Sequence, residues 1–426
     1  MTQRLNVDSL PGPDTIARRT FPNGVVGLAY ENFSSPSVVV HGWLWAGSID
    51  VPREKAGLSG LTASLLTRGT ESRTFAQISE EIESVGATLS AGSAGHTTRF
   101  TIKCLVEDLP LLMDILTNCL YHPVFPVEYV ERRRGEILTA LEQREQNTQA
   151  MASLRFSETM YPDHPYGNSQ LGYPETVKAL TRQDIEAFYR QHYGARGMTV
   201  TIVGAVPCQE GLDILQQAFG SWQGADHVQA PLPPLRPLLE RKKMYTEIPG
   251  KSQSDIVLGW PGISKRDPDF HKAYLADCVL GRFGMMGRIG QHVRENQGLA
   301  YYVYTSLDAG IGPGPWVAVA GVAPENVDPA IEAVMAQIRR MRTELVGEQE
   351  LADNKAFIVD SLPLQLEGNE GIAAQIVNME LFELGLDYLK RFPGIIESIT
   401  ADDIRAIAER VMVPEAYVLS VAGPAS

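Results

Sequence analysis

The side chains that could bind a metal ion or act as a general base are scattered along this 426-residue chain. Its eight histidines include no HxxxH pair, and none lies near another with the spacing of zinc ligands. An isolated histidine is usually a surface or hydrogen-bonded core residue, so we expect no metal site in the chain itself. The histidines are His41, His96, His122, His164, His192, His227, His271 and His292.

The cysteines and the overall charge limit the classes of function. Four cysteines form no CxxC motif and no dense framework, so we expect reduced thiols and a cytoplasmic protein. We find no apolar signal segment and no apolar run long enough to span a bilayer, which predicts a protein without a membrane partner. The formal charge of −14 argues against nucleic acid as a partner, because such binders need basic patches.

Two segments of the chain resemble each other closely enough to indicate an internal duplication. Residues 180–204 and 399–423 align without gaps at an offset of 219 residues. In both, a threonine stands three residues before an aspartate, Thr181 before Asp184 and Thr400 before Asp403, which predicts a helix N-cap. An amphipathic helix and an apolar strand ending in glycine follow. At the same offset, residues 106–141 align with a second predicted pair of helices that begins near Glu325.

A proline-rich stretch separates the two copies. Four prolines between Pro231 and Pro237, followed by a basic cluster, cannot form a helix and predict a semi-rigid extended linker. We therefore expect an N-terminal domain (1–225), a linker (226–245) and a C-terminal domain (246–426).

The order of the predicted elements indicates the fold class. Apolar runs at 24–32, 37–48 and 97–106 predict strands, whereas 107–121, 126–147 and 149–160 predict helices. Strands and helices are grouped rather than strictly alternating. This favours an α+β fold of two homologous α/β sandwich domains, each a mostly antiparallel sheet with helices packed on one face.

The segment GLSGLTASLLTRGT (57–70) resembles the active-site helix of the pitrilysin/insulinase family of zinc peptidases, whose active members show a GLxHxxEHxxxxGT pattern. Other segments resemble that family in the same order, from NGVVGLAYEN through GATLSAGSAGHTTRF and ERRRGEILTALEQREQN to HPYGNSQLG. The resemblance implies that the chain forms half of a clam-shell peptidase chamber. It also implies that an edge strand can pair with an extended peptide.

The catalytic residues of that family are missing. In the inverted motif HxxEH, two histidines bind Zn²⁺, the glutamate activates water, and a distant glutamate completes the metal site. Aligned on the final Gly-Thr pair, the two histidine positions hold Gly60 and Ser64, and the catalytic glutamate position holds Ala63. The last ligand position falls at Ala140. With three ligands and the general base absent, we expect the chain to be inactive by itself.

A different pair of functional residues persists in the second half. The segment GRFGMMGRIGQHVRENQGLAYYVYTS (281–306) resembles the region that supplies the family's substrate-binding arginine and tyrosine, seven residues apart at a helix-to-strand turn. Arg294 and Tyr301 have this spacing. The resemblance implies that they bind substrate carbonyls and support the transition state. Without the resemblance, the arginine would be interpreted as a solvated charge at a helix end and the tyrosine as a packed residue of a strand.

The chain lacks the zinc ligands but retains the arginine and tyrosine, and this combination leads to one hypothesis and several alternatives. The chain is expected to be the non-catalytic subunit of a heterodimeric zinc metallopeptidase, acting on a peptide substrate with an HxxEH-bearing partner of the same family that holds the zinc ion. One alternative is a structural scaffold subunit of a larger complex, as in inactive relatives in respiratory complexes. Others are a peptide-binding accessory protein, or an active peptidase with relocated metal ligands.

Overall fold

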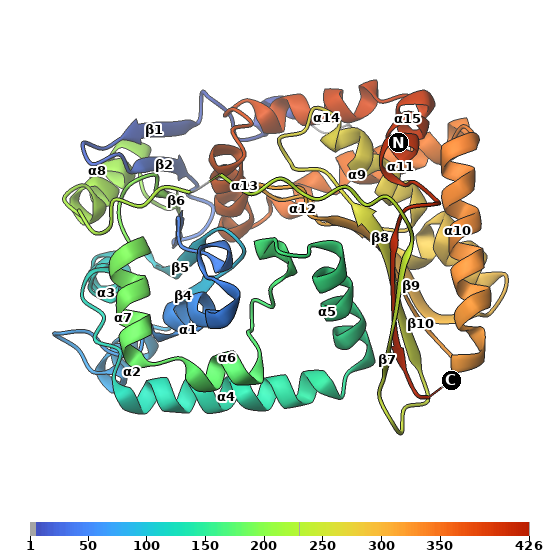
Figure 1. Cartoon of the computed structure of the whole chain (residues 1–426). Helices are drawn as coiled ribbons and strands as arrows, with labels where there is room; N and C mark the ends of the chain where they lie inside the picture. Colours follow the sequence, from blue (N-terminus) through green and yellow to red (C-terminus); the bar gives the residue numbers. More distant parts are fainter. Residues whose placement is uncertain (1–5, 230, 426) are drawn as a thin grey trace. The chain divides into compact units, whose positions relative to one another are not determined.

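The structure is a computed structural model that describes residues 6–229 and 231–425. Contacts divide the chain into two compact units (Figure 1). The first comprises Met1–Thr139, Ser169–Pro231 and Leu362–Lys390, and the second comprises Ala140–Asn168, Leu232–Ser361 and Arg391–Ser426. Each unit contains segments that are far apart in the sequence.

Each unit is built on one mostly antiparallel sheet. The first sheet has the order β1-β2-β6-β3-β5-β4, and only β2 and β6 pair in parallel. The second has the order β7-β11-β8-β10-β9, with β7 and β11 in parallel. The strands are β1 (Ile16–Thr20), β2 (Val26–Glu31), β3 (Ser37–Leu44), β4 (Thr88–Ser93), β5 (Thr98–Leu105), β6 (Thr199–Gly204), β7 (Lys242–Glu247), β8 (Ser254–Pro261), β9 (Ala300–Leu307), β10 (Pro315–Val322) and β11 (Val418–Gly423).

Helices make up most of the remaining regular structure and confirm the mixed α+β class. Within the described part of the chain, none of them combines the length and the apolar character needed to cross a bilayer. The helices are α1 (Leu58–Leu65), α2 (Phe75–Ser84), α3 (Leu109–Tyr121), α4 (Val127–Glu145), α5 (Thr148–Met160), α6 (Pro174–Ala179), α7 (Arg182–His192), α8 (Cys208–Phe219), α9 (Phe270–Leu280), α10 (Val327–Thr343), α11 (Glu348–Asp360), α12 (Leu362–Gln365), α13 (Asn369–Leu381), α14 (Tyr388–Ser398) and α15 (Ala401–Val411).

The elements predicted from sequence periodicity are present. The three predicted strands correspond to β2, β3 and β5, and the three predicted helices to α3, α4 and α5. The cause is clearest in α3, where Leu112, Ile115, Leu116 and Cys119 recur at helical spacing and are all buried. The same apolar stripe that predicts the helix also anchors it to its unit.

The internal duplication is confirmed in the local structure. Helix α15 and strand β11 begin and end at the offset of 219 residues from α7 and β6 that the sequence predicts. Both helices start with a complete capping box. The Thr181 and Thr400 hydroxyls accept the N–H of Asp184 and Asp403, whose carboxylates accept the threonine N–H in return. The two sheets also share their strand order, apart from the additional edge strand β1.

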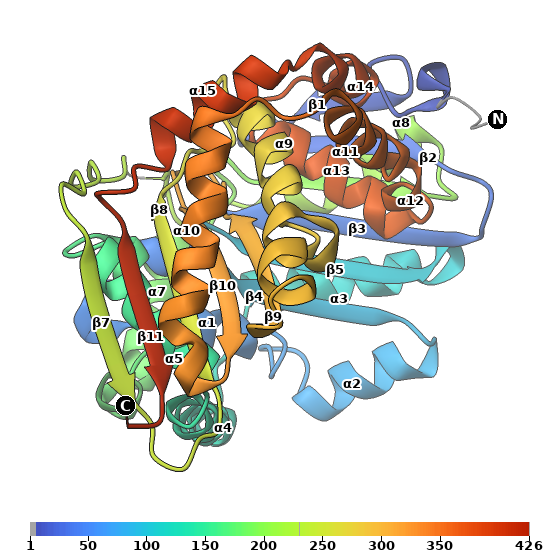
Figure 2. The same ribbon diagram turned by 90° about the vertical axis from the view of Figure 1, so that its right-hand side faces the viewer.

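The second sheet is covered on both faces. Alternate residues of β8 point to opposite sides. Ile256 and Leu258 lie in an apolar cluster with residues of α9, α10 and α15, whereas Val257 packs in another cluster with Met151 and Phe156 of α5. The figures show α5 on one side of this sheet and α10 on the other (Figures 1 and 2). The helix layer predicted for one face is therefore joined by a single helix on the opposite face.

The first sheet is completed by α13, which packs on β3 and β6. Asn369, the buried first residue of α13, donates to the backbone oxygen of Ser37 at 3.0 Å and accepts from the side chain of Asn32 at 2.8 Å. Each sheet is thus completed by one helix from the other half of the sequence. The contact-based units therefore differ from the contiguous domains 1–225 and 246–426, which describe the sequence repeat.

The proline-rich segment between the repeats contains no helix or strand in its described residues 226–229 and 231–241. Strand β7 begins at Lys242, so the last residues assigned to the linker belong to the second sheet. The backbone oxygen of Pro233 lies 3.2 Å from Nε2 of His164, which docks this segment onto the second unit.

The capping box of α15 predicts a pH-dependent contribution to stability. The Thr400 backbone N–H and hydroxyl, with the Lys272 ammonium 3.0 Å away, lower the pKa of Asp403 from 3.8 to about 2. Because this pKa is depressed by folding, the stabilisation is present above pH 4 and is lost as the pH falls from about 4 to 2. The thermal unfolding midpoint of Asp403→Asn should lie below wild type at pH 6, and the gap should close towards pH 2. A gap that stays constant with pH would contradict this. Asp402→Asn removes an exposed neighbouring charge outside the box and serves as the control.

Candidate functional site

The helix that corresponds to the family's zinc motif is present but carries no metal ligands. In α1, Gly60 has no side chain and Ala63 is a buried methyl group. The hydroxyl of Ser64 donates to the backbone oxygen of Leu61 at 2.8 Å, so it is used within the helix. Ala140, at the position of the distant ligand, adds only a methyl group to α4. These four residues do not fit a zinc ion.

Arg294 and Tyr301 lie on either side of a helix-to-strand turn in the second unit, as the sequence predicts. Arg294 is in a short π-helical turn, η7 (Gly290–Glu295). The N–H of Gly298 donates to the backbone oxygen of Arg294 at 2.9 Å, and the N–H of Leu299 donates to that of Val293 at 3.0 Å. Gly298 has a φ of +63°, which favours glycine because it has no Cβ. Strand β9 then begins at Ala300.

Tyr301 is the extra residue of a β-bulge at the edge of the second sheet. Val322 of β10 pairs with Ala300, and Gly321 pairs with Tyr302, so that Tyr301 has no partner in the register. A bulge re-aims the side chain of the extra residue and often lies next to a functional site. The Tyr301 side chain is accordingly 58 % exposed, a high value for a residue in a strand.

The next residue, Tyr302, is held by contacts with other residues of the second unit. Its hydroxyl donates to the carboxylate of Asp255, and its ring stacks on that of Tyr304. Burial and the carboxylate raise the pKa of Tyr302. The two neighbouring tyrosines therefore differ: Tyr302 is fixed by the protein, whereas Tyr301 faces solvent.

Arg294 is close to an exposed apolar surface. Its guanidinium contacts the sulfur of Met285 at 2.9 Å and forms no ion pair with any residue that the structure describes. Met285 belongs to segment 281–287, in which Phe283 and Met286 are also exposed, Met286 by 78 %. The Phe283 ring packs 4.4 Å from that of Phe357. A cation that pairs with no described carboxylate thus contacts Met285, whose segment exposes two further apolar side chains, an arrangement that suits binding of a peptide.

A buried carboxylate anchors this region. Asp277, near the end of α9, accepts the indole N–H of Trp316 at 2.8 Å and the N–H of Leu307 at 3.1 Å, and pairs with Arg282 at 3.1 Å. Its backbone oxygen accepts the N–H groups of Gly281 and Arg282. Burial raises its pKa. Sequence reasoning missed Asp277, although a single carboxylate in the apolar stretch AYLADCVLG was a signal for it.

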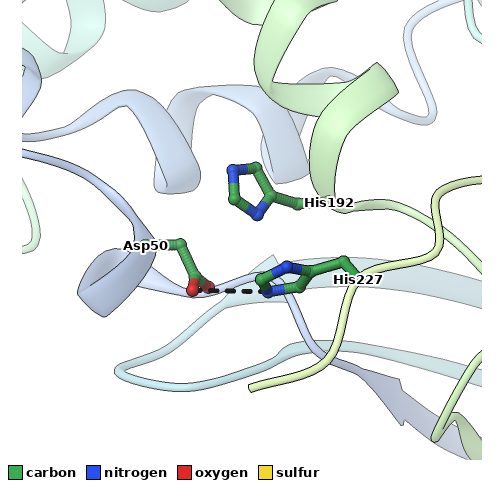
Figure 3. Close-up of side chains that lie close together, drawn as sticks. All are labelled: Asp50, His192 and His227. Atoms are coloured by element: carbon green, nitrogen blue, oxygen red, sulfur yellow. Dashed lines mark ion pairs between the residues drawn. The ribbon is translucent and has the colours of Figure 1, made fainter. Parts of the chain in front are cut away.

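A second group of polar residues lies in the first unit and was also missed. Asp50, His192 and His227 approach one another, with one potential ligand atom of each within 4.8 Å of the others (Figure 3). The Oδ1 of Asp50 lies 3.4 Å from the Nε2 of His227. Burial lowers the pKa of His192; the charge of Asp50 opposes this shift, and the charge of His227 adds to it more weakly. No local spacing indicates this group, because its members come from three distant segments.

Two repeated α+β halves, a helix in place of the zinc-binding helix and an Arg/Tyr turn define the class as a zinc-peptidase homologue with a degenerate metal site. Comparison of the sequence with family models agrees. Residues 28–174 match the model described as insulinase (peptidase family M16), and residues 179–357 match the peptidase M16 inactive domain. Together these matches cover more than half of the chain. The chain belongs to the pitrilysin/insulinase family of peptidases.

Individual relatives resemble the chain over nearly its whole length. It is 28 % identical to an uncharacterized zinc protease of Streptomyces coelicolor, over 97 % of this chain and 90 % of the relative. It is 23 % identical to a probable mitochondrial-processing peptidase subunit beta of Arabidopsis thaliana, over 97 % and 79 %. The crystal structure of a peptidase M16 inactive domain from Pseudomonas fluorescens superposes with a TM-score of 0.90 at 22 % identity, over 96 % and 98 %, which shows the same fold.

Proposed function

We propose that this chain is the non-catalytic subunit of a heterodimeric zinc metallopeptidase. In this proposal, a partner of the same family carries the HxxEH motif and holds the zinc ion. This chain supplies Arg294 and Tyr301, which bind the peptide substrate and support the transition state. The observation that carries the proposal is the solvent-facing Tyr301 on its bulge, in a chain whose zinc-motif positions hold Gly60, Ala63 and Ser64.

The chemistry of the pair supports this role. A guanidinium and a phenol hydroxyl both donate hydrogen bonds, and a peptide offers carbonyl oxygens as acceptors. When a carbonyl carbon is attacked, negative charge develops on its oxygen, so that donors aimed at this oxygen stabilise the transition state more than the substrate. Arg294 forms no ion pair with a described residue, which leaves its charge free for such an oxygen.

The surroundings of the pair support peptide binding. Strand β9, which carries Tyr301, forms one edge of the second sheet. An edge strand can bind an extended peptide through main-chain hydrogen bonds, which depend little on side chains. The exposed Phe283, Met285 and Met286 offer apolar contacts to side chains of the peptide. We infer a cytoplasmic location for this complex from the four free cysteines.

Reconstitution tests the proposal. The chain is mixed with an HxxEH-bearing family member of similar size from the same organism, and hydrolysis of a quenched fluorescent peptide library is followed. We expect neither chain alone to cleave, the mixture to cleave, and EDTA to abolish the activity. A partner whose HxxEH glutamate is replaced by glutamine is the matched control.

Other outcomes would replace the proposal. Cleavage by this chain alone would assign it a metal site of its own for catalysis. A complex that holds peptide without cleaving it would make the chain a peptide-binding accessory protein. Co-purification with a larger assembly, without any peptide binding, would make it a scaffold subunit.

A further inference from the structure

Three segments of the first unit converge on one small cluster of metal-ligating side chains. Asp50 ends a short 3₁₀ turn, η2 (Ser48–Asp50), which follows β3. His192 is the last residue of α7. His227 lies in the extended segment after α8. The ring planes of the two histidines are 81° apart with centroids at 4.5 Å, and the carboxylate of Asp50 lies beside them (Figure 3).

The distances are close to those of a tetrahedral metal site. Ligand atoms about 2.1 Å from a tetrahedral zinc ion are about 3.4 Å from one another. The Asp50 Oδ1 and His227 Nε2 atoms already have this separation, at 3.4 Å. All three ligand atoms lie within 4.8 Å.

The hydrogen bonding of the cluster is incomplete. The Nδ1 of His192 and the Nε2 of His227 are buried and form no hydrogen bond of good geometry with any described residue; for His227 Nε2, the 3.4 Å ionic contact with Asp50 remains. An unsatisfied buried polar atom costs roughly 1–3 kcal/mol. A metal ion would give such nitrogens a partner, since neutral imidazole binds metals through a ring nitrogen.

The carboxylate is already oriented. The Asp50 side chain is only 6 % exposed, and its Oδ2 accepts the N–H of Gly47 at 2.8 Å. This bond fixes the carboxylate and leaves Oδ1 directed at His227. Hydrogen bonds of this kind to a ligating group are characteristic of metal sites, where they hold the ligand in position.

We propose that Asp50, His192 and His227 bind one Zn²⁺ ion, with water as the fourth ligand. Two imidazoles and one carboxylate suit zinc or a similar transition metal, whereas Mg²⁺ and Ca²⁺ prefer oxygen ligands alone. The site is separate from the positions of the family's zinc motif, Gly60, Ala63, Ser64 and Ala140. It departs from the expectation, drawn from sequence spacing, that the chain itself holds no metal.

The site would have a structural role. The ion would tie the extended segment around His227 to the end of α7 and to the turn after β3. A bound metal stabilises the folded state because the unfolded chain does not present its ligands together. Zinc should therefore raise the thermal unfolding midpoint of the chain.

Metal analysis of the full-length chain without a histidine tag tests the proposal. The protein is stripped with EDTA, dialysed against ZnCl₂ and then against metal-free buffer, and its zinc content is measured by mass spectrometry. We expect about one zinc ion per chain. We expect His227→Gln and Asp50→Asn to weaken zinc binding by at least about tenfold and to abolish the rise in the unfolding midpoint. Cobalt should give visible absorption bands in wild type and not in the variants.

A matched control is His122→Gln, which removes an exposed histidine of the same unit and should retain the metal. His227 lies outside any helix or strand, so its variant should stay folded, as circular dichroism will verify. A wild-type chain that retains no zinc would overturn the proposal, as would variants that retain it fully. The measurement uses the chain without a partner, so its outcome is independent of the proposed peptidase role.

Discussion

Replacing Arg294 with alanine should lower kcat of the reconstituted peptidase by on the order of 10²-fold. Loss of a single oxyanion donor in an enzyme typically has an effect of this size, because the donor binds the transition state more strongly than the substrate. Arg294→Lys should recover part of the activity, since it keeps the charge but not the planar fork of donors. Steady-state kinetics on one defined peptide would separate the effects on kcat and KM.

Tyr301→Phe should act in the same direction, since only the hydroxyl is removed, and the double variant should lose less than the product of the two single effects. The chain offers close controls. Tyr245 is exposed on β7, at the opposite edge of the same sheet, and Arg339 is exposed on α10. Tyr245→Phe and Arg339→Ala should leave turnover within about twofold of wild type. If the Arg294 and Tyr301 variants do the same, the assigned role is wrong.

The second large effect is expected on stability. Replacing Asp277 with alanine should destabilise the second unit by about 3–5 kcal/mol. It leaves the buried donors of Trp316 and Leu307 without an acceptor, at roughly 1–3 kcal/mol each, and removes the partner of Arg282. Chemical denaturation followed by tryptophan fluorescence would report the loss, because Trp316 lies in the affected core.

A matched control is Asp328→Ala, which removes a carboxylate that is 85 % exposed in the same unit and should change stability by less than about 0.5 kcal/mol. Equal stability of the Asp277 and Asp328 variants would contradict the anchoring role. Because the Asp277 carboxylate pairs with Arg282 at 3.1 Å and the variant loses this pairing, hydrogen exchange in segment 281–287 should also rise in the Asp277 variant.

Much of the local structure could be predicted because its cause is local. The stripe from Leu112 to Cys119 predicts α3 through its spacing. The capping boxes at Thr181 and Thr400 mark two helix starts, since the cap and its partner are only three residues apart. Arg294 and Tyr301 are likewise joined by one short turn, so their placement follows from a few residues. Such signals need no knowledge of the tertiary fold.

Features that depend on distant pairing could not be predicted in this way. The bulge at Tyr301 depends on the register with β10, which is set by residues about twenty positions away. The approach of His192 and His227 to Asp50 requires three elements of the folded unit. Ligand spacing along the sequence predicts only sites on a single helix or turn, so it does not indicate these histidines.

Helices α5 and α13 each complete the sheet of the other half of the sequence, and this arrangement bears on the origin of the chain. A fragment that ends near residue 225 contains the first sheet without the helix that covers β3 and β6, and it carries α5 without a sheet to cover. Two copies of one ancestral half could each cover the sheet of the other with this helix, as domain-swapped dimers do. Joining the copies in a single gene makes this association intramolecular and independent of concentration. It also releases the halves from symmetry, so that the first could lose its metal ligands while the second kept its arginine and tyrosine.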